Sequence, residues 1–298
     1  MSFIISTDSS SDLLKGYLEK NNIYCIVMRR IQNGEEIGKI FESSDEFDAF
    51  YEDIKKGALP TTTLLNQTEL EEYFKTILAK EPKGDIIHLP ISCGLSATHA
   101  NAVKAAAEIN KTLKGRKIYV FDTLTTVAGL SMLVERLIAM RDKKLSAENA
   151  LKEIERVRDH LHVWAMADNL FHLKRGGRIS GLKAAMGTIL GVKPIFIVNT
   201  KGKLTVEHKA KGHKEAINYM LEKLKTEGTD KGFDPLKNKI YAMRSSKSAT
   251  YDQFIKTLKE TYPNAIIEEG VVGPVVGTHV GPGVIGLIFE GAKRLNID

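Results

Sequence analysis

The stretch "DIIHLPISCGLSATHANAVKAAAEINKTLKGRKIYVFDT", Asp85 to Thr123, places an alanine-rich segment between two short apolar ones. Residues 85–92 and 116–123 are apolar and rich in β-branched or aromatic side chains, which is typical of buried strands. Residues 96–113 have the alanine-rich composition of a helix. A strand, a helix and a second strand in this order predict a unit of parallel sheet.

The same alternation continues on both sides of this unit. Upstream, "FIIS" (residues 3–6) predicts a short strand, and the Ser- and Asp-rich segment after it predicts a capped turn and a helix. Downstream, residues 126–142 have the pattern of a long amphipathic helix. Strands that alternate with helices predict a parallel sheet covered on both faces, so we expect an α/β domain over residues 1–161.

The pattern changes after a charged helix predicted at residues 146–161. Two apolar segments flank "TKG" and predict a β-hairpin. Helices are predicted at residues 214–226 and 249–260, with apolar strands between and after them. A chain of 298 residues exceeds the size at which one core stops growing. We therefore expect a second, α+β domain over residues 162–298, and a ligand site in the cleft between the two domains.

Composition excludes several classes of protein. Lys and Arg exceed Asp and Glu by 43 to 37, for a net charge of +6, but the basic residues are dispersed and lack interleaved aromatics, which argues against a DNA-associated regulator. Cys25 and Cys93 have no metal-ligand or disulfide spacing, so we expect neither. The opening residues do not resemble a signal peptide, and the apolar window 271–289 is interrupted by glycines, prolines and His279. We expect a cytoplasmic protein without an integral membrane segment.

Two glycine-rich motifs suggest nucleotide binding only superficially. "GPGVIG", residues 281–286, matches GxGxxG, but too little chain follows for the rest of a dinucleotide unit, so we set it aside. "KRGGRIS", residues 174–180, is basic but lacks the phosphate-loop pattern. We interpret it as a helix end closed by Gly176 and Gly177 rather than a phosphate site.

Uncharged hydroxyl groups gather where the chain is expected to turn. "LPTTTLLN" (residues 59–66) supplies three threonines ahead of a helix, and "ISCGLSATHANA" (residues 91–102) supplies Ser96 between a strand and a helix. A helix N-terminus offers free N–H donors and a partial positive charge, so Ser96 lies where an anion could bind. Ordinary N-capping explains the same residue equally well.

His279 stands in what we interpret as a glycine turn, beside Gly277, Gly281 and Gly283. Glycines let the backbone approach a ligand closely, although a lone histidine is often only a core or surface residue. A hydrolase built from Ser96, His279 and Asp122 is an alternative, but "GLSATH" is not the GxSxG nucleophile motif. We favour a site in which two hydroxyls and a histidine hold a carboxylate without chemistry.

Six stretches, in order, resemble the DegV family of bacterial fatty-acid-binding proteins, over about residues 4–289. They are "STDSSSDL" at the N-terminus, "PTTTLLN", "ISCGLSATHANA", "LKRGGRIS", "GVKPIF" and "GTHVGPG". The resemblance implies a two-domain α/β protein that encloses one long-chain fatty acid in a tunnel at the domain junction. It also implies that the protein presents the carboxylate to a separate ATP-dependent fatty acid kinase, which makes acyl phosphate for phospholipid synthesis, and is itself neither a catalyst nor cofactor-dependent.

By the same resemblance, Thr62, Ser96 and His279 contact the carboxylate. Thr63, Arg178, Gly277 and Thr278 are further candidates near the head group, and the tunnel wall is expected to include Ala184, Met186, Ile189, Leu190 and Phe196. The sequence departs from the family pattern at Leu65, Ala97 and Lys211, where Pro, Gly and Arg are usual. A lysine cannot form the bidentate contact that an arginine forms, so the change at Lys211 would alter any contact that the kinase makes at this position. Brief contact with a membrane is compatible with this function.

Overall fold

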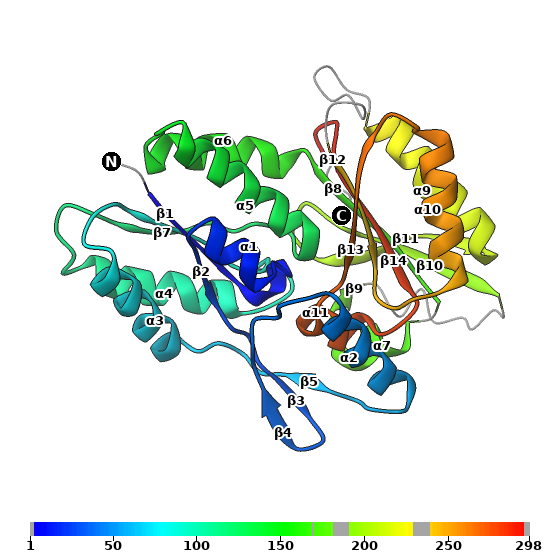
Figure 1. The fold of residues 1–298 in the computed structure, drawn as a ribbon, viewed down its shortest axis with the longest axis horizontal. Helices are drawn as coiled ribbons and strands as arrows, with labels where there is room; N and C mark the ends of the chain where they lie inside the picture. The colour runs from blue at the N-terminus through cyan, green and yellow to red at the C-terminus, as the bar shows by residue number, and fades with distance from the viewer. Residues whose placement is uncertain (1–2, 169, 181–190, 229–238, 295–298) are drawn as a thin grey trace.

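The computed structural model describes residues 3–168, 170–180, 191–228 and 239–294 (Figure 1). Its first sheet is four-stranded and parallel, in the order β2 (Ile23–Ile26), β1 (Ile4–Asp8), β6 (Ile86–Leu89) and β7 (Ile118–Val120). Helices α3 (Gln67–Lys80) and α4 (Thr98–Asn110) cover one face, and α1 (Lys15–Lys20), α5 (Val127–Asp142) and α6 (Ala147–Asp159) cover the other. The expected parallel sheet with helices on both faces is confirmed.

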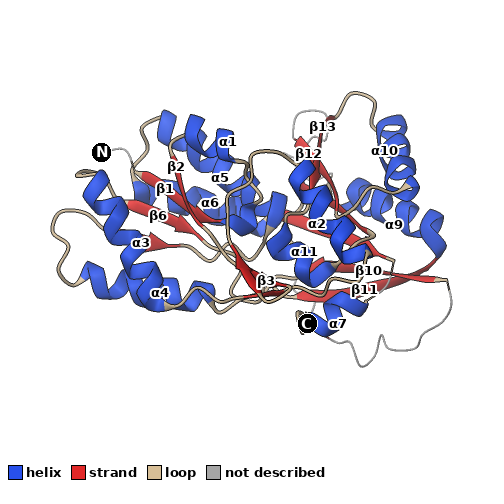
Figure 2. Ribbon diagram, turned by 60° about the horizontal axis from the view of Figure 1, so that its bottom comes forward, coloured by secondary structure: helices blue, strands red, loops and turns tan. Residues whose placement is uncertain are grey.

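The second sheet is mixed and seven-stranded. Its order is β13 (Ile266–Val271), β12 (Lys239–Arg244), β14 (Val284–Glu290), β8 (Leu161–Ala167), β10 (Val192–Val198), β11 (Leu204–Lys211) and β9 (Ile179–Ser180). Strands β10 and β11 form the antiparallel hairpin predicted around "TKG". Helices α9 (Gly212–Glu227) and α10 (Ala249–Thr261) cover one face, and the other face is turned toward the first sheet (Figure 2). The division that we propose between residues 161 and 162 would fall at the start of β8.

The central strands of the second sheet are apolar on both faces, because successive side chains of a strand point to opposite sides. On β8, Trp164 and Met166 pack with α9 and α10, whereas Val163 and Ala165 belong to the core shared with α5. Strands β10 and β14 alternate in the same way. The face that α9 and α10 do not cover is therefore apolar as well, so it must pack against other parts of the protein or line a cavity.

Several parts of the fold were not predicted from the sequence, and strand β2 is one of them. A small sheet contains β4 (Glu35–Ile37), β3 (Arg30–Gln32) and β5 (Thr61–Thr62), and helix α2 spans Asp45–Lys55. The expected glycine turn around His279 was wrong in part, because Pro274–Val280 form a helix, α11. Pro at its first turn suits helix initiation, and Gly281, at φ +72°, ends it.

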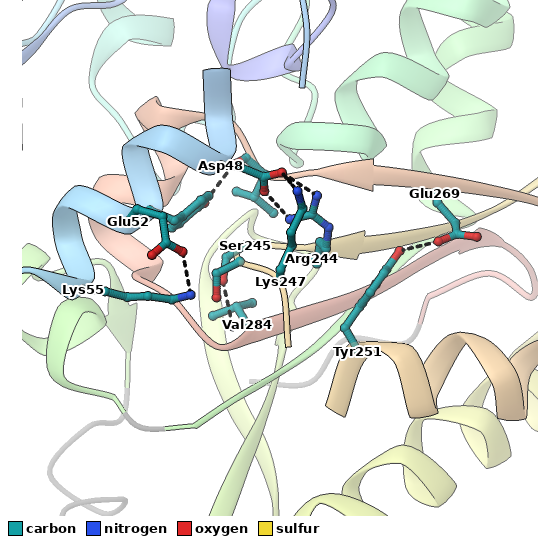
Figure 3. A network of polar contacts seen from close by, with 12 residues as sticks. Asp48, Glu52, Lys55, Arg244, Ser245, Lys247, Tyr251, Glu269 and Val284 are labelled. Carbon is teal, nitrogen blue, oxygen red and sulfur yellow. Dashed lines mark hydrogen bonds and ion pairs between the residues drawn. The ribbon is translucent and has the colours of Figure 1, made fainter. Parts of the chain in front are cut away.

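Helix α2 is held against the second sheet by residues that are 196 positions apart in the sequence. The Asp48 carboxylate of α2 accepts hydrogen bonds from both terminal nitrogens of Arg244, which lies at the end of β12 (Figure 3). The Lys247 ammonium lies 3.0 Å from the same carboxylate. Tyr51 donates to the carbonyl oxygen of Val272 at 2.8 Å. These contacts hold α2 in place next to α11.

We predict that Asp48→Ala lowers the free energy of unfolding by about 2 kcal/mol, because it leaves the Arg244 guanidinium, 13% exposed, without its carboxylate partner. Glu52→Ala is the matched control on the same helix, since Glu52 pairs with the more exposed Lys55 and should change stability by less than about 0.5 kcal/mol. Urea denaturation of both variants makes the comparison. Equal effects would show that the Asp48 pair contributes no more than a surface contact.

Candidate ligand site between the two sheets

A cavity lies between the carboxyl edge of the first sheet and the open apolar face of the second. Its empty volume is about 1000 Å³, including the part that is open to solvent. The first sheet contributes Ile91, Leu95, Ser96, Thr126 and Val127 from loops and a helix start that follow its strands. In open parallel sheets, ligands bind at the carboxyl ends of the strands, at the point where the connections from two neighbouring strands run to opposite faces of the sheet. Here that point lies between β1 and β6.

The apolar wall consists of alternate residues from neighbouring strands of the second sheet. They are Val163 and Ala165 on β8, Phe196 and Val198 on β10, Leu204 on β11, Met243 on β12, and Val284, Gly286 and Ile288 on β14. Gly286 pairs with Ala165 on one side and with Met243 on the other. Gly286 and Ala165 have the smallest side chains of the wall, so they leave empty space for the cavity at the centre of the sheet.

The polar end of the cavity joins two segments that are 217 residues apart. The hydroxyl oxygen of Thr62, on β5, and Nε2 of His279, in the last turn of α11, share a hydrogen bond of 2.8 Å. Thr63, Ser96 and Arg178 line the same cavity. The structure therefore brings the three predicted carboxylate contacts, Thr62, Ser96 and His279, to one cavity.

The imidazole of His279 is neutral at physiological pH. Desolvation, together with the nearby guanidinium groups of Arg178 and Arg175, lowers its pKa to about 4. Nδ1 is buried and has no hydrogen-bond partner in the part of the chain that the structure describes. A neutral imidazole and a threonine hydroxyl give this end of the cavity donors and acceptors without a full charge.

This depressed pKa predicts part of the protein's acid sensitivity. Between pH 6.5 and about 4 the unfolded chain binds a proton at His279 that the folded chain does not, so stability falls as the pH falls through this window. From pH 7 to pH 5 the loss from this residue is about 2 kcal/mol. In urea denaturation, His279→Gln should lose about that much less stability than the wild type over the same interval. Parallel pH profiles would contradict the neutral, buried imidazole.

The motif "KRGGRIS" holds the helix that faces His279. Helix α7 (Phe171–Gly176) ends at Gly177, with φ +64°, as predicted for a glycine-closed helix end. A Cβ at Gly176 would lie 2.5 Å from Nδ1 of His279, so glycine lets the two helices approach closely. Arg175 donates to the carbonyl oxygens of Pro60 and Thr278, at 2.7 and 3.3 Å. It therefore ties α7 to both segments that bear the Thr62–His279 pair.

Ser96 is not the N-cap of α4: that position is Ala97, and Ser96 is the residue before it. Its hydroxyl accepts from the backbone N–H of Thr98 at 3.2 Å, at the start of α4, and donates to the Thr98 hydroxyl at 3.0 Å. It lines the cavity as well. The loop that carries it is fixed by Ser92, whose hydroxyl donates to the Gly202 carbonyl of the β10–β11 hairpin at 2.8 Å.

The remaining predicted residues are placed differently. Gly277 and Thr278 lie in α11 but do not line the cavity: a Cβ at Gly277 would meet the Tyr51 hydroxyl oxygen at 2.4 Å, and the Thr278 hydroxyl donates to the Pro274 carbonyl at 2.8 Å. Phe196 lies in the wall as expected. Ala184, Met186, Ile189 and Leu190 lie outside the described residues.

Sequence reasoning missed most of the wall, including Val163, Ala165, Met243 and Gly286. The alternation on these strands was readable, but it does not tell a face packed on helices from a face that borders a cavity. Gly286 was the one available signal, because a glycine inside an apolar strand often marks a close approach or an open space.

Within residues 3–168, 170–180, 191–228 and 239–294, no group of three or more His, Cys, Asp or Glu side chains could hold a metal ion. The helices of this described part are all too short or too polar to cross a bilayer. Cys25 and Cys93 are both free thiols.

Fold and site together define an α/β protein of two packed sheets with an apolar cavity between them and the Thr62–His279 pair at one end. The chain belongs to the DegV family: the family model described as "Uncharacterised protein, DegV family" matches residues 2–292. It is 29% identical to a DegV domain-containing protein of Clostridium perfringens over 98% of each chain. It is also 29% identical to Protein DegV of Bacillus subtilis, over 97% of this chain and 99% of that one.

Solved structures show the same fold. The crystal structure of DegV from Bacillus subtilis, described as a fatty acid binding protein, has a TM-score of 0.83 at 25% identity, covering 98% of this chain and 99% of that one. A DegV family protein from Thermus thermophilus, described by its fatty acid binding, has a TM-score of 0.81 at 25% identity, over 98% of this chain and all of that one.

Proposed function

We propose that this protein binds one long-chain fatty acid, with the acyl tail along the wall of the second sheet and the carboxylate at Thr62, Ser96 and His279. The observation that carries the proposal is the cavity between the two sheets, which is apolar over most of its lining and has the Thr62–His279 hydrogen bond at one end. Relatives of the same fold that are described as fatty acid binding support it.

The acyl tail supplies the affinity. A palmitate tail has about fifteen carbons beyond the carboxyl group, and at ~0.8 kcal/mol per buried methylene its transfer from water is worth on the order of 12 kcal/mol before the costs of binding. A wall of Val, Ile, Leu, Phe and Met side chains is suited to this transfer, since it offers no polar group that burial of the tail would leave unpaired.

The head group needs donors, because a carboxylate buried without partners is costly. The hydroxyls of Thr62 and Ser96 and the neutral imidazole of His279 can supply them. Neutral donors hold the carboxylate without a tight ion pair and leave its oxygens nucleophilic. Arg178 also lines the cavity, but its guanidinium donates to the carbonyl oxygen of Gly176 at 2.6 Å and its side chain is exposed.

We further propose that the bound carboxylate is handed to a separate ATP-dependent fatty acid kinase, in the cytoplasm, for acyl phosphate formation and phospholipid synthesis. An oxygen that is bound by hydroxyls can attack the γ-phosphate that the kinase supplies, so the protein itself acts as a carrier. This step rests on the family resemblance and on the uncharged chemistry of the cavity end.

Exposed apolar side chains next to the cavity suit the uptake of a fatty acid from a bilayer. Leu64 lines the cavity and is 47% exposed, and Leu59 and Phe171 are exposed by more than half. Arg175 connects them, since it lies one turn after Phe171 on α7 and donates to the Leu59 carbonyl oxygen. We propose that this rim makes transient contact with membrane lipid.

The serine esterase alternative finds less support in the contacts of Ser96. A nucleophilic serine shares a hydrogen bond with its base, whereas the Ser96 hydroxyl bonds to Thr98 and the His279 Nε2 bonds to Thr62. A fluorophosphonate probe distinguishes the two: stoichiometric labelling of Ser96 would favour the esterase, and absence of labelling the carrier.

Mass spectrometry of lipid extracted from the denatured, purified protein tests the binding function. We expect one long-chain fatty acid per chain. Absence of bound lipid, together with failure to bind added palmitate, would overturn the proposal. For the kinase step, the loaded protein should yield acyl phosphate only when a DegV-associated fatty acid kinase and ATP are both added; acyl phosphate formed without the kinase would contradict the carrier role.

A further inference from the structure

The motif "TDSSSDL" has so far had no part in the site. Asp8 is the last residue of β1, at the carboxyl edge of the first sheet, and Ser9–Ser11 after it form a short 3₁₀ turn, η1, that leads to Asp12. Ser10 and Ser11 are fully buried. Three side chains of this segment bind backbone N–H groups of three distant segments, and each of those segments leads to one polar residue of the cavity lining.

Asp8 holds the segment that leads to Ser96. One carboxylate oxygen accepts from the backbone N–H of Ile91 at 2.8 Å, and the other accepts from the N–H of Ser10 at 2.9 Å. Ile91 opens the loop after β6 that ends at Ser96. The aspartate therefore spans the ends of β1 and β6, where the chain connections diverge.

Ser9 holds the segment that supports Thr62. Its hydroxyl accepts from the backbone N–H of Met28 at 2.9 Å, just ahead of β3. Strand β3 pairs with β5 through Arg30 and Thr62, and the N–H of Thr63 bonds to the Arg29 carbonyl at 2.9 Å. Ser9 thus fixes the start of β3, and the pairing of β3 with β5 in turn fixes the position of Thr62.

Asp12 holds the helix that carries His279. Its carboxylate accepts from the N–H of Gly273 at 2.8 Å, and Gly273 is the residue before the first turn of α11. No side chain of α11's own segment caps this end, so the cap comes from 261 residues away. A Cβ at Gly273 would lie 2.1 Å from the carboxylate, which shows how closely the two groups fit.

Charge favours the same arrangement along α11. The Arg175 guanidinium, which donates to the Thr278 carbonyl at the C-terminal end, complements the helix dipole. Desolvation, with the nearby charge of Asp8, raises the pKa of the Asp12 carboxyl well above its usual range. The Asp12 carboxyl group thus lies at the start of α11, in an environment that opposes its ionisation.

We propose that Asp12 is a positioning residue for His279: it fixes the start of α11, and through this helix the imidazole against Thr62. The proposal rests on the proposed function for the role of His279 toward a carboxylate. It accounts for Asp12 without assigning it any contact with the ligand.

The test compares Asp12→Ala with Asp12→Asn, which keeps an oxygen acceptor for Gly273. Asp85→Ala is the matched control, because Asp85 accepts a backbone N–H, that of Lys117, at 2.8 Å in the same sheet but outside the cavity lining. Two readouts are taken: the titration of the His279 ring by ¹⁵N NMR in ligand-free protein, and the Kd for palmitate.

In Asp12→Ala, α11 should shift and admit water to the ring, so the His279 pKa should rise from about 4 toward its ordinary value of 6.5, and palmitate should bind about tenfold more weakly. Asp12→Asn should stay within about threefold of the wild type, and Asp85→Ala should match it. In a His279→Ala background, Asp12→Ala should have no further effect on Kd, because its influence passes through that ring.

An unchanged His279 titration in folded Asp12→Ala would overturn the inference, and so would an equal loss of affinity with and without His279. If Asp12→Ala does not fold, Gly273→Ala replaces it, since its Cβ displaces the carboxylate without removing it, and the same rise in the His279 pKa is expected. Because the titration needs no ligand, a wild type that binds no palmitate would refute the proposed function while the NMR result still decides the role of Asp12.

Discussion

Gly286→Leu is expected to abolish stoichiometric palmitate binding, with a loss of affinity of several hundredfold. Gly286 lies in the middle of the wall, where a Cβ would already meet Met243 Cβ at 3.3 Å and Ile288 Cδ1 at 3.5 Å. The rest of a leucine side chain must then occupy the cavity and displace about four methylenes of the tail, worth ~3–4 kcal/mol at ~0.8 kcal/mol each. Isothermal titration with palmitate measures the loss.

Chain length separates a filled cavity from a damaged fold. The Gly286→Leu variant should bind decanoate with little change relative to the wild type, since a short tail does not need the filled space. Gly16→Leu, at an exposed glycine with open space around its Cβ, should bind palmitate normally. Wild-type palmitate affinity in Gly286→Leu would show that the tail does not lie on this sheet.

Thr62→Val is expected to weaken fatty acid binding by about 30- to 100-fold, and equally for long and short acids. The substitution keeps the shape but removes the hydroxyl that bonds to His279 Nε2, so both the imidazole and the bound carboxylate lose a partner. Hydrogen bonds to charged groups are worth ~1.5–3 kcal/mol. Titration with palmitate and decanoate gives the two ratios to compare.

Thr61→Val is the control for this change, because Thr61 is the preceding residue of β5, is exposed and does not line the cavity. It should bind both acids like the wild type. A loss in Thr62→Val that grows with acyl length would place Thr62 along the tail instead of at the head group. No loss at all would remove Thr62 from the site.

Much of the fold followed from local sequence patterns. The alternation over residues 85–123 predicted a helix between two parallel strands, and "TKG" predicted the hairpin, because in both cases the determining residues are neighbours in sequence. Helix α11 was missed for the opposite reason. Its segment is rich in glycine and valine, which are poor helix formers, and its N-terminal cap comes from Asp12, 261 residues away.

The site was predictable only as far as its motifs. Thr62, Ser96 and His279 could be named from the sequence, but not the 2.8 Å contact between Thr62 and His279, which depends on how α7 and α2 hold α11. Gly277 illustrates the limit: its glycine suggested a ligand, whereas it makes room for Tyr51. Most wall residues resemble ordinary core, since burial is the same on both faces of the second sheet.

A crystal structure of the protein grown with palmitate tests the central claim most directly. The account predicts one acyl chain between the two sheets, in contact with Gly286 and Ala165, and a carboxylate oxygen within hydrogen-bond distance of the Thr62 and Ser96 hydroxyls. Palmitate bound elsewhere, or a closed cavity with Thr62 and His279 apart from any ligand, would contradict it.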